Sequence, residues 1–228
     1  MKKAFTLVEL LIVIALIAIL SVAVLATINP IEQSNKAKDS TVRNDAAEVM
    51  NAYERFYANS QSYPWMVYGP VASKPSVEDA FILRSDQVGF GICSGSSADL
   101  TVPPNTPSAA CDPNNSTDPG LLISKDELKL AFVGKDEFRT VGTNDENGLF
   151  LYKAAGSGGS IYVCYVPKAK SNRDPATNQL WCLNGTSLTR SAVNGTTCIA
   201  PATTGDAAWA EADTAITDGD IAIFKCVP

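Results

Sequence analysis

The sequence predicts an α+β protein in which a long N-terminal helix packs against an antiparallel sheet, and three observations indicate this. A run of nearly all apolar residues, with one acid as its single charged residue, covers residues 5–28. Apolar side chains then recur every three or four residues through 29–60, the spacing of one helix face. In 61–228, short β-branched and aromatic runs alternate with clusters of Gly, Pro, Asn and Ser, which is typical of strands joined by loops.

The apolar run from Phe5 to Ile28 is long enough to cross a membrane as a helix. At about 1.5 Å per residue it extends about 36 Å, and a hydrocarbon core is roughly 30 Å thick. Backbone polar groups in lipid must be bonded within the segment, so a helix is expected. Lys2 and Lys3 precede the run, which favours a single pass with residues 61–228 outside the cytoplasm.

One carboxylate, Glu9, lies inside this run. At membrane depth an ionised carboxylate is costly unless it is neutralised or paired. The nearby cations in the chain are Lys2 and Lys3. A cut between Ala4 and Phe5 would create another, the new amine, which a neighbouring copy can supply. This hypothesis explains together the short basic leader, the aromatic Phe5 and the glutamate at the fifth position after the cut.

These residues resemble the N-terminal signature of the type IV pilins and of the pseudopilins of type II secretion. The signature is a short basic leader, then Phe-Thr-Leu-Ile/Val-Glu-Leu and an apolar helix; here it consists of Phe5, Thr6, Leu7, Val8, Glu9 and Leu10. The resemblance covers residues 1–60. Two features depart from the family pattern: Ala4 replaces the usual glycine before the cut, and Pro30 lies later than the usual helix-bending proline.

The resemblance implies a type IV pilin-like fold and a prepilin. Residues 1–4 are the leader removed by a prepilin peptidase, Phe5 is then N-methylated, and Glu9 pairs with the Phe5 amine of a neighbouring subunit as the 5–28 helices pack into a filament. It further implies a precursor in the bacterial inner membrane, an extracellular fibre after assembly, and the pilus or secretion machinery as partners. The fibre would serve adhesion, motility or DNA uptake.

Several alternatives remain open. In one alternative the chain is a pseudopilin of a type II secretion system. In another it is a membrane-anchored adhesin or binding module that does not polymerise. A secretory signal cut after Val24-Leu25-Ala26 would leave a protein that starts at Thr27, and an unprocessed anchor is also conceivable. The length of the apolar run and the acid within it favour the prepilin interpretation. Direct nucleic-acid binding is not expected, because 61–228 carries eighteen acidic and twelve basic residues.

Residues 29–60 are predicted to continue the helix with a single apolar face. Asn29 suits a helix cap and Pro30 a first helical turn, so the helix kinks or restarts at Pro30. One continuous helix over 5–59 and two helices joined at Pro30 both fit the sequence. Ser62-Tyr63-Pro64 is expected to end the helix. The apolar face comprises Val42, Ala46, Val49, Met50, Tyr53, Phe56 and Tyr57.

Residues 61–228 are predicted to form a globular, disulfide-rich α+β head. Helices are expected to begin at Ser76 and run through Phe81 and Leu83, and to begin at Ser124 and run to about Val133. Strands are expected at 149–152, 161–166, 180–183 and 221–226, the first two joined in a hairpin by a glycine-rich turn at 156–159. The sheet would cover the second half of the helix.

All cysteines lie in the head, at Cys93, Cys111, Cys164, Cys182, Cys198 and Cys226. An even number in a region expected outside the cytoplasm indicates disulfides. The preferred pairing is the local set, Cys93–Cys111, Cys164–Cys182 and Cys198–Cys226. A zinc site is disfavoured because the chain has neither a CxxC pair nor a histidine. The lack of histidine also excludes Ser-His-Asp and Cys-His catalysis, so no enzyme is expected.

One loop has a weak calcium pattern, with oxygen ligands alternating at Asp112, Asn114, Ser116 and Asp118. It lacks the glycine at the sixth position, and Ile123 stands where a bidentate glutamate belongs. A solvated turn is therefore preferred, with calcium as the alternative, and no other cofactor is expected. The three tryptophans are expected in the core first, and otherwise at a subunit contact or adhesive surface: Trp65, Trp181 and Trp209.

Overall fold

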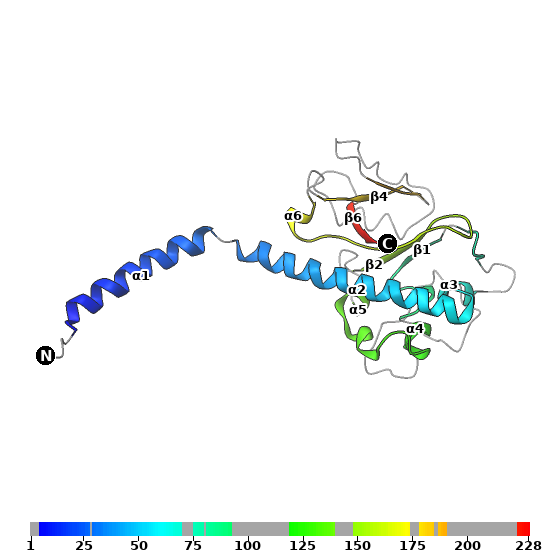
Figure 1. Cartoon of the computed structure of the whole chain (residues 1–228), viewed down its shortest axis with the longest axis horizontal. Coiled ribbons are helices and arrows are strands. Elements are labelled where there is room, and N and C mark those ends of the chain that lie inside the picture. The colour runs from blue at the N-terminus through cyan, green and yellow to red at the C-terminus, as the bar shows by residue number, and fades with distance from the viewer. Residues whose placement is uncertain are drawn as a thin grey trace.

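The computed structural model describes residues 5–27, 29–69, 75–79, 81–92, 119–139, 148–173, 178–184, 187–190 and 223–228. Its α1 helix (Leu7–Thr27) projects away from a head built on α2 (Pro30–Ser60) (Figure 1). The other head elements are α3 (Pro64–Val67), β1 (Phe81–Arg84), the 3-10 helix η2 (Val88–Phe90), α4 (Leu121–Ser124), the 3-10 helix η3 (Leu130–Gly134), α5 (Asp136–Arg139), β2 (Leu149–Lys153), β3 (Ile161–Tyr165), α6 (Lys170–Arg173), β4 (Trp181–Asn184), β5 (Ser187–Arg190) and β6 (Ile223–Val227).

The N-terminal helix is in two pieces that meet at Asn29. The backbone of Asn29 is extended, and its side chain accepts hydrogen bonds from the amides of Ile31 and Glu32. Pro30 then occupies the first turn of α2, where its missing N–H costs nothing. The restart predicted at Pro30 is therefore confirmed, and the alternative of one continuous helix over 5–59 is wrong.

The second half of α2 carries the centre of the hydrophobic core. Six of its side chains are at most 7% exposed: Ala46, Val49, Met50, Ala52, Tyr53 and Phe56. These positions include most of the predicted apolar stripe, because a spacing of three and four residues places them on one face. Trp65 packs edge-on against Tyr53 and is 1% exposed, as predicted for a core tryptophan.

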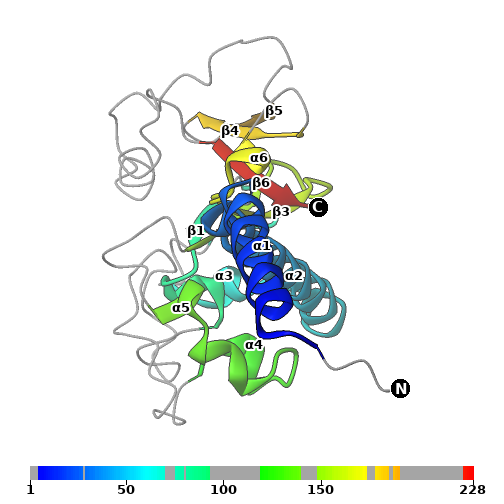
Figure 2. The ribbon, with the colours of Figure 1, turned by 90° about the vertical axis from the view of Figure 1, so that its left-hand side faces the viewer.

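The sheet is antiparallel throughout, in the order β1-β2-β3-β6-β4-β5. Four strands, β1-β2-β3-β6, form the sheet beside α2, which contacts β3 and β6. The sheet and the short helices α4 and α5 lie on opposite sides of α2 (Figure 2). The α+β class is confirmed, and so is the hairpin joining β2 and β3.

Two predicted helices are wrong. Residues 76–79 form a turn and not a helix. The following residues, Phe81–Arg84, form strand β1 because they pair with Lys153–Phe150 of β2. The helix expected from Ser124 is absent because α4 ends at Ser124. Asp126 then adopts a left-handed conformation, with φ of 60°. A separate 3-10 helix, η3, follows at Leu130.

Two of the three preferred disulfide pairs are wrong. Cys164 is bonded to Cys226, instead of Cys164 to Cys182 and Cys198 to Cys226. The reason is strand order: β6 lies between β3 and β4, so Cys226 is directly opposite Cys164 in the register. The side chain of Cys182, and Cys93, Cys111 and Cys198, lie outside the described residues.

Candidate functional site

The first turn of α1 holds the predicted assembly residue in a reciprocal cap. The Thr6 backbone N–H and the Thr6 hydroxyl donate to Oε2 of Glu9, at 2.9 and 2.8 Å. The Glu9 backbone N–H donates back to the Thr6 hydroxyl oxygen at 3.2 Å. This arrangement is a capping box, which satisfies amides that a helix start leaves unpaired.

The carboxylate of Glu9 has a partner at the start of its own helix. From the sequence, cations are the expected partners of its carboxylate, whereas in the structure the partner is Thr6 of the same chain. The signal was visible in the sequence, since Thr6-Leu7-Val8-Glu9 has the spacing of a capping box. Both bonds end on Oε2, so among the described residues Oε1 has no hydrogen-bond partner. Pairing with a neighbour's amine stays a prediction.

The surface of α1 is apolar on every side. Its large aliphatic side chains are exposed around the whole helix: Leu7, Val8, Leu10, Leu11, Ile12, Val13, Ile14, Leu16, Ile17, Ile19, Leu20, Val22 and Val24. Phe5, just before the helix, is 77% exposed. A continuous exposed apolar surface of this kind marks an interaction surface.

The predicted membrane span over 5–28 is not supported by the described residues. Within them, which omit the side chains of Ala23 and of residues 25–27, no helix is sufficiently long and apolar to cross a membrane.

Two carboxylates of α2 hold the segment around α6. Asp39, 3% exposed, accepts hydrogen bonds from the amides of Lys168 and Ala169 and from Nδ2 of Asn172, at 2.7, 3.0 and 2.6 Å. Two turns earlier, Glu32 accepts from the amides of residues 170 and 171. The Ser171 amide is the main cause that lowers the pKa of Glu32. Both contacts join residues far apart in sequence, and sequence reasoning missed them.

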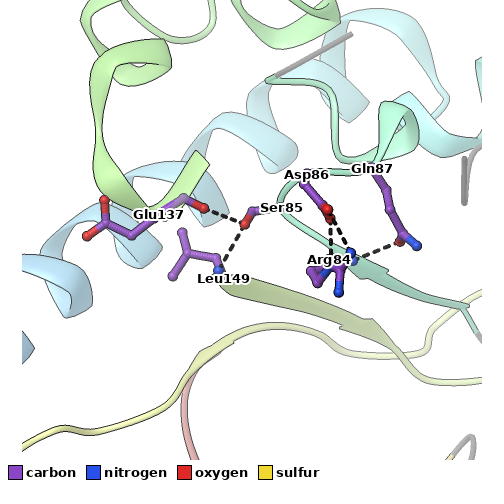
Figure 3. Close-up of polar contacts among 6 residues, drawn as sticks. All are labelled: Arg84, Ser85, Asp86, Gln87, Glu137 and Leu149. Atoms are coloured by element: carbon purple, nitrogen blue, oxygen red, sulfur yellow. Dashed lines mark hydrogen bonds and ion pairs between the residues drawn. The ribbon is translucent and has the colours of Figure 1, made fainter. Parts of the chain in front are cut away.

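A second polar junction connects the edge of the sheet to α5 (Figure 3). The buried Ser85 hydroxyl donates to the backbone carbonyl of Glu137 at 2.6 Å and accepts from the amide of Leu149. Arg84 forms a two-point ion pair with Asp86 at 2.6 and 2.7 Å. These contacts pair backbone groups and charges within the fold, so they explain why polar residues are buried here.

Burial of the Glu137 side chain raises its pKa, and the neighbouring Asp45 adds to the increase. Asp45 in turn forms an ion pair with Lys135, whose ammonium group lies over the ring of Phe132. The junction between α2, η3 and α5 is therefore built from charges that face one another. The ion pair between Lys135 and Asp45 attaches the segment between η3 and α5 to α2.

The remaining predicted site residues lie outside the described part of the chain. They are Ala4 of the leader junction and the calcium candidates Asp112, Asn114, Ser116 and Asp118. Within the described ranges, no group of three or more His, Cys, Asp or Glu side chains is placed to hold a metal ion.

Comparison with known proteins gives one match. Residues 1–25 match the family model described as the prokaryotic N-terminal methylation motif. This segment contains Thr6, Glu9 and most of α1. Neither the curated proteins nor the solved structures contain a match to the chain.

Proposed function

We propose, from the type IV pilin and pseudopilin precursor signal that residues 1–25 carry, that this chain is a structural subunit of a type IV pilus. A prepilin peptidase removes residues 1–4, and Phe5 becomes the methylated first residue. The precursor waits in the inner membrane through α1, with the head outside the cytoplasm. It then joins an extracellular filament for adhesion, motility or DNA uptake, and its role is structural and not catalytic.

The exposed apolar surface of α1 supports this proposal. In water this surface would be unfavourable at about 25 cal/mol for each Å². Both lipid and a bundle of identical helices remove it from water, so the apolar surface alone hardly distinguishes the two states. A polar contact that forms only in the bundle must then determine which state is preferred and how the helices align.

The geometry of Glu9 is the observation that carries the proposal. Thr6 occupies Oε2, and Oε1 has no hydrogen-bond partner in the described residues. A carboxylate has about four acceptor positions over its two oxygens. Glu9 can therefore keep its cap and also accept the amine of Phe5 from a neighbouring subunit, so assembly adds a charge pair without breaking the first turn of α1.

The test is Glu9→Gln, compared with Glu54→Gln at an exposed acidic position of α2. Glutamine keeps an oxygen for the cap but removes the charge, so leader removal should proceed while filament yield, counted by electron microscopy, falls at least tenfold. Glu54→Gln should assemble normally. Normal filaments from Glu9→Gln would contradict the charge pairing.

Sequencing the mature N-terminus tests the wider proposal. A methylated Phe5 is expected. An intact Met1 would support the anchored, non-polymerising alternative, and a start at Thr27 would indicate a secretory signal. A methylated Phe5 in material that forms only short assemblies within a secretion system would indicate a pseudopilin.

A further inference from the structure

A cavity of about 380 Å³ lies at the end of β6, between α2, β3 and the chain before β4. It is within the size range of small-molecule sites, roughly 300–1,000 Å³. Exposed Arg43 and Gln179 are among its lining residues, so it opens to solvent. Tyr165 and Lys225 are opposite each other in the β3–β6 register, whereas Tyr162 belongs to the other face of β3. The cavity therefore wraps around the end of β6.

One side of the cavity carries two cations, Arg43 and Lys225, and neither forms an ion pair with a carboxylate among the described residues. The half-buried Lys225 ammonium donates to two neutral amide oxygens, Oδ1 of Asn172 at 3.1 Å and Oδ1 of Asn178 at 2.8 Å. The Arg43 guanidinium makes no hydrogen bond or ion pair among the described residues. The buried acid that acts on Lys225, Asp39, already accepts three hydrogen bonds.

The electrostatics of this side agree with the geometry. Burial lowers the pKa of Lys225, Asp39 opposes this decrease, and Arg43 adds to it. Burial also raises the pKa of Tyr165 to about 12, so its hydroxyl stays protonated and can donate a hydrogen bond. Two like charges and a hydroxyl donor beside one open cavity favour an anion, because an anion would relieve the repulsion between the cations.

The other side of the cavity has the chemistry that recognises a ring bearing hydroxyl groups. Tyr162 and Trp181 lie with their ring centroids 5.1 Å apart. They offer flat apolar surface together with polar ring atoms. Exposed Gln179 adds an amide group, which can both donate and accept hydrogen bonds, whereas the Asn178 amide already donates to the Ser171 carbonyl and accepts from Lys225. A bare inorganic anion would use none of these groups.

We infer that this cavity binds an acidic sugar, with the carboxylate between Arg43 and Lys225 and the ring extending around the end of β6 toward Tyr162 and Trp181. Arginine suits this role because its planar donors match a carboxylate in a two-point contact. The inference concerns the head and is independent of assembly through α1.

The experiment is a ligand-observed NMR titration of the full chain in nonionic detergent with galacturonate, galactose and acetate. Galacturonate should bind, and galactose and acetate should each bind at least tenfold more weakly, because each lacks one half of the recognised chemistry. Acetate binding as tightly as galacturonate, galactose binding as tightly, or no binding of galacturonate would each overturn the inference.

Arg43→Gln supplies the matched test, with Lys125→Gln as the control. Both positions are exposed and each substitution removes one positive charge, but Lys125 lies beside α4, away from the cavity. Arg43→Gln should weaken galacturonate binding at least tenfold with unchanged thermal unfolding, and Lys125→Gln should leave binding unchanged. Equal loss in both variants, or no loss in Arg43→Gln, would overturn the assignment.

Discussion

The two long helices, α1 and α2, use apolar residues in opposite ways. Val22 in α1 is 68% exposed, whereas Val49 in α2 is fully buried against the head. In α1 apolar residues occupy every side, so no orientation toward the head could bury them all. In α2 they occupy one stripe, and the other sides carry charges. The comparison teaches that the periodicity of apolar residues, more than their number, decides whether a helix belongs to its own fold or to another partner.

The largest expected effect is on the buried side of this comparison. Tyr53→Ala removes a fully buried ring that contacts Trp65 and Phe90, and it should lower the free energy of unfolding of the head by about 3–5 kcal/mol. Tyr53→Phe removes only the hydrogen bond from the hydroxyl to the carbonyl of Phe90, 2.6 Å long, and should cost about 1 kcal/mol. Chemical denaturation of the full chain in detergent measures both. Equal losses would show that the hydroxyl, and not the ring, dominates.

Asp39 tests whether α2 holds the head by polar contacts as well as by its apolar stripe. Asp39→Asn keeps the shape but removes the charge and leaves donors facing an amide group, so it should destabilise the head by about 2–3 kcal/mol. The exposed Glu54→Gln is the control and should change stability by less than about 0.5 kcal/mol. If Asp39→Asn behaves like the control in the same denaturation assay, the contacts with residues 168–172 add nothing to stability.

The matched pair Val49→Ala and Val22→Ala makes the comparison between the helices direct. The same two methyl groups are removed from a buried and from an exposed position. Val49→Ala should lower the unfolding free energy by about 1–2 kcal/mol, and Val22→Ala should not change it. A loss of head stability in Val22→Ala would show that α1 contributes to the fold of the head.

The smallest expected effect depends on pH. The pKa of Glu32 is lowered in the fold, chiefly by the Ser171 amide, so its contribution is present above the ordinary glutamate pKa and is lost as the pH falls through the lower folded value. Hydrogen exchange at the amides of Lys170 and Ser171 measures this contribution. Protection relative to Glu32→Gln should be present at neutral pH and disappear in acid, once the pH falls below the lowered pKa of Glu32. Protection that is equal in the two proteins at neutral pH would contradict the role of Glu32.

Local patterns predicted the parts of the fold that depend on local chemistry. The stripe of α2 followed from helical spacing, and the β2–β3 hairpin from β-branched and aromatic residues around a glycine turn. Residues 76–79 show the limit of such patterns. The Ser76 amide does bond to the side chain of Asp79, and the amide of Glu78 to the hydroxyl of Ser76, as at a helix start. The chain nevertheless continues into β1, because pairing with β2 outweighs the local preference.

The features that the sequence did not predict depend on distant partners. The contacts of Asp39 with Lys168 and Ala169 span about 130 residues, and no short pattern identifies them. The pairing of Cys164 with Cys226 depends on which strands are neighbours in the sheet, which spacing along the chain does not reveal. The capping box of Thr6 and Glu9 is different: its signal is local, in the spacing of the two residues, and only a prediction based on charge alone misses it.

The place of β6 in the sheet constrains the order of events during biosynthesis. Residues 223–227 pair with β3 on one side and with β4 on the other, so the strand order is incomplete until these residues have been synthesised. Closing such long-range pairs is slow compared with forming helices and hairpins. Under the proposed function, in which the chain is exported while α1 holds it in the membrane, the nascent chain carries an unfinished sheet with open edges until β6 enters, and those edges need protection from neighbouring chains.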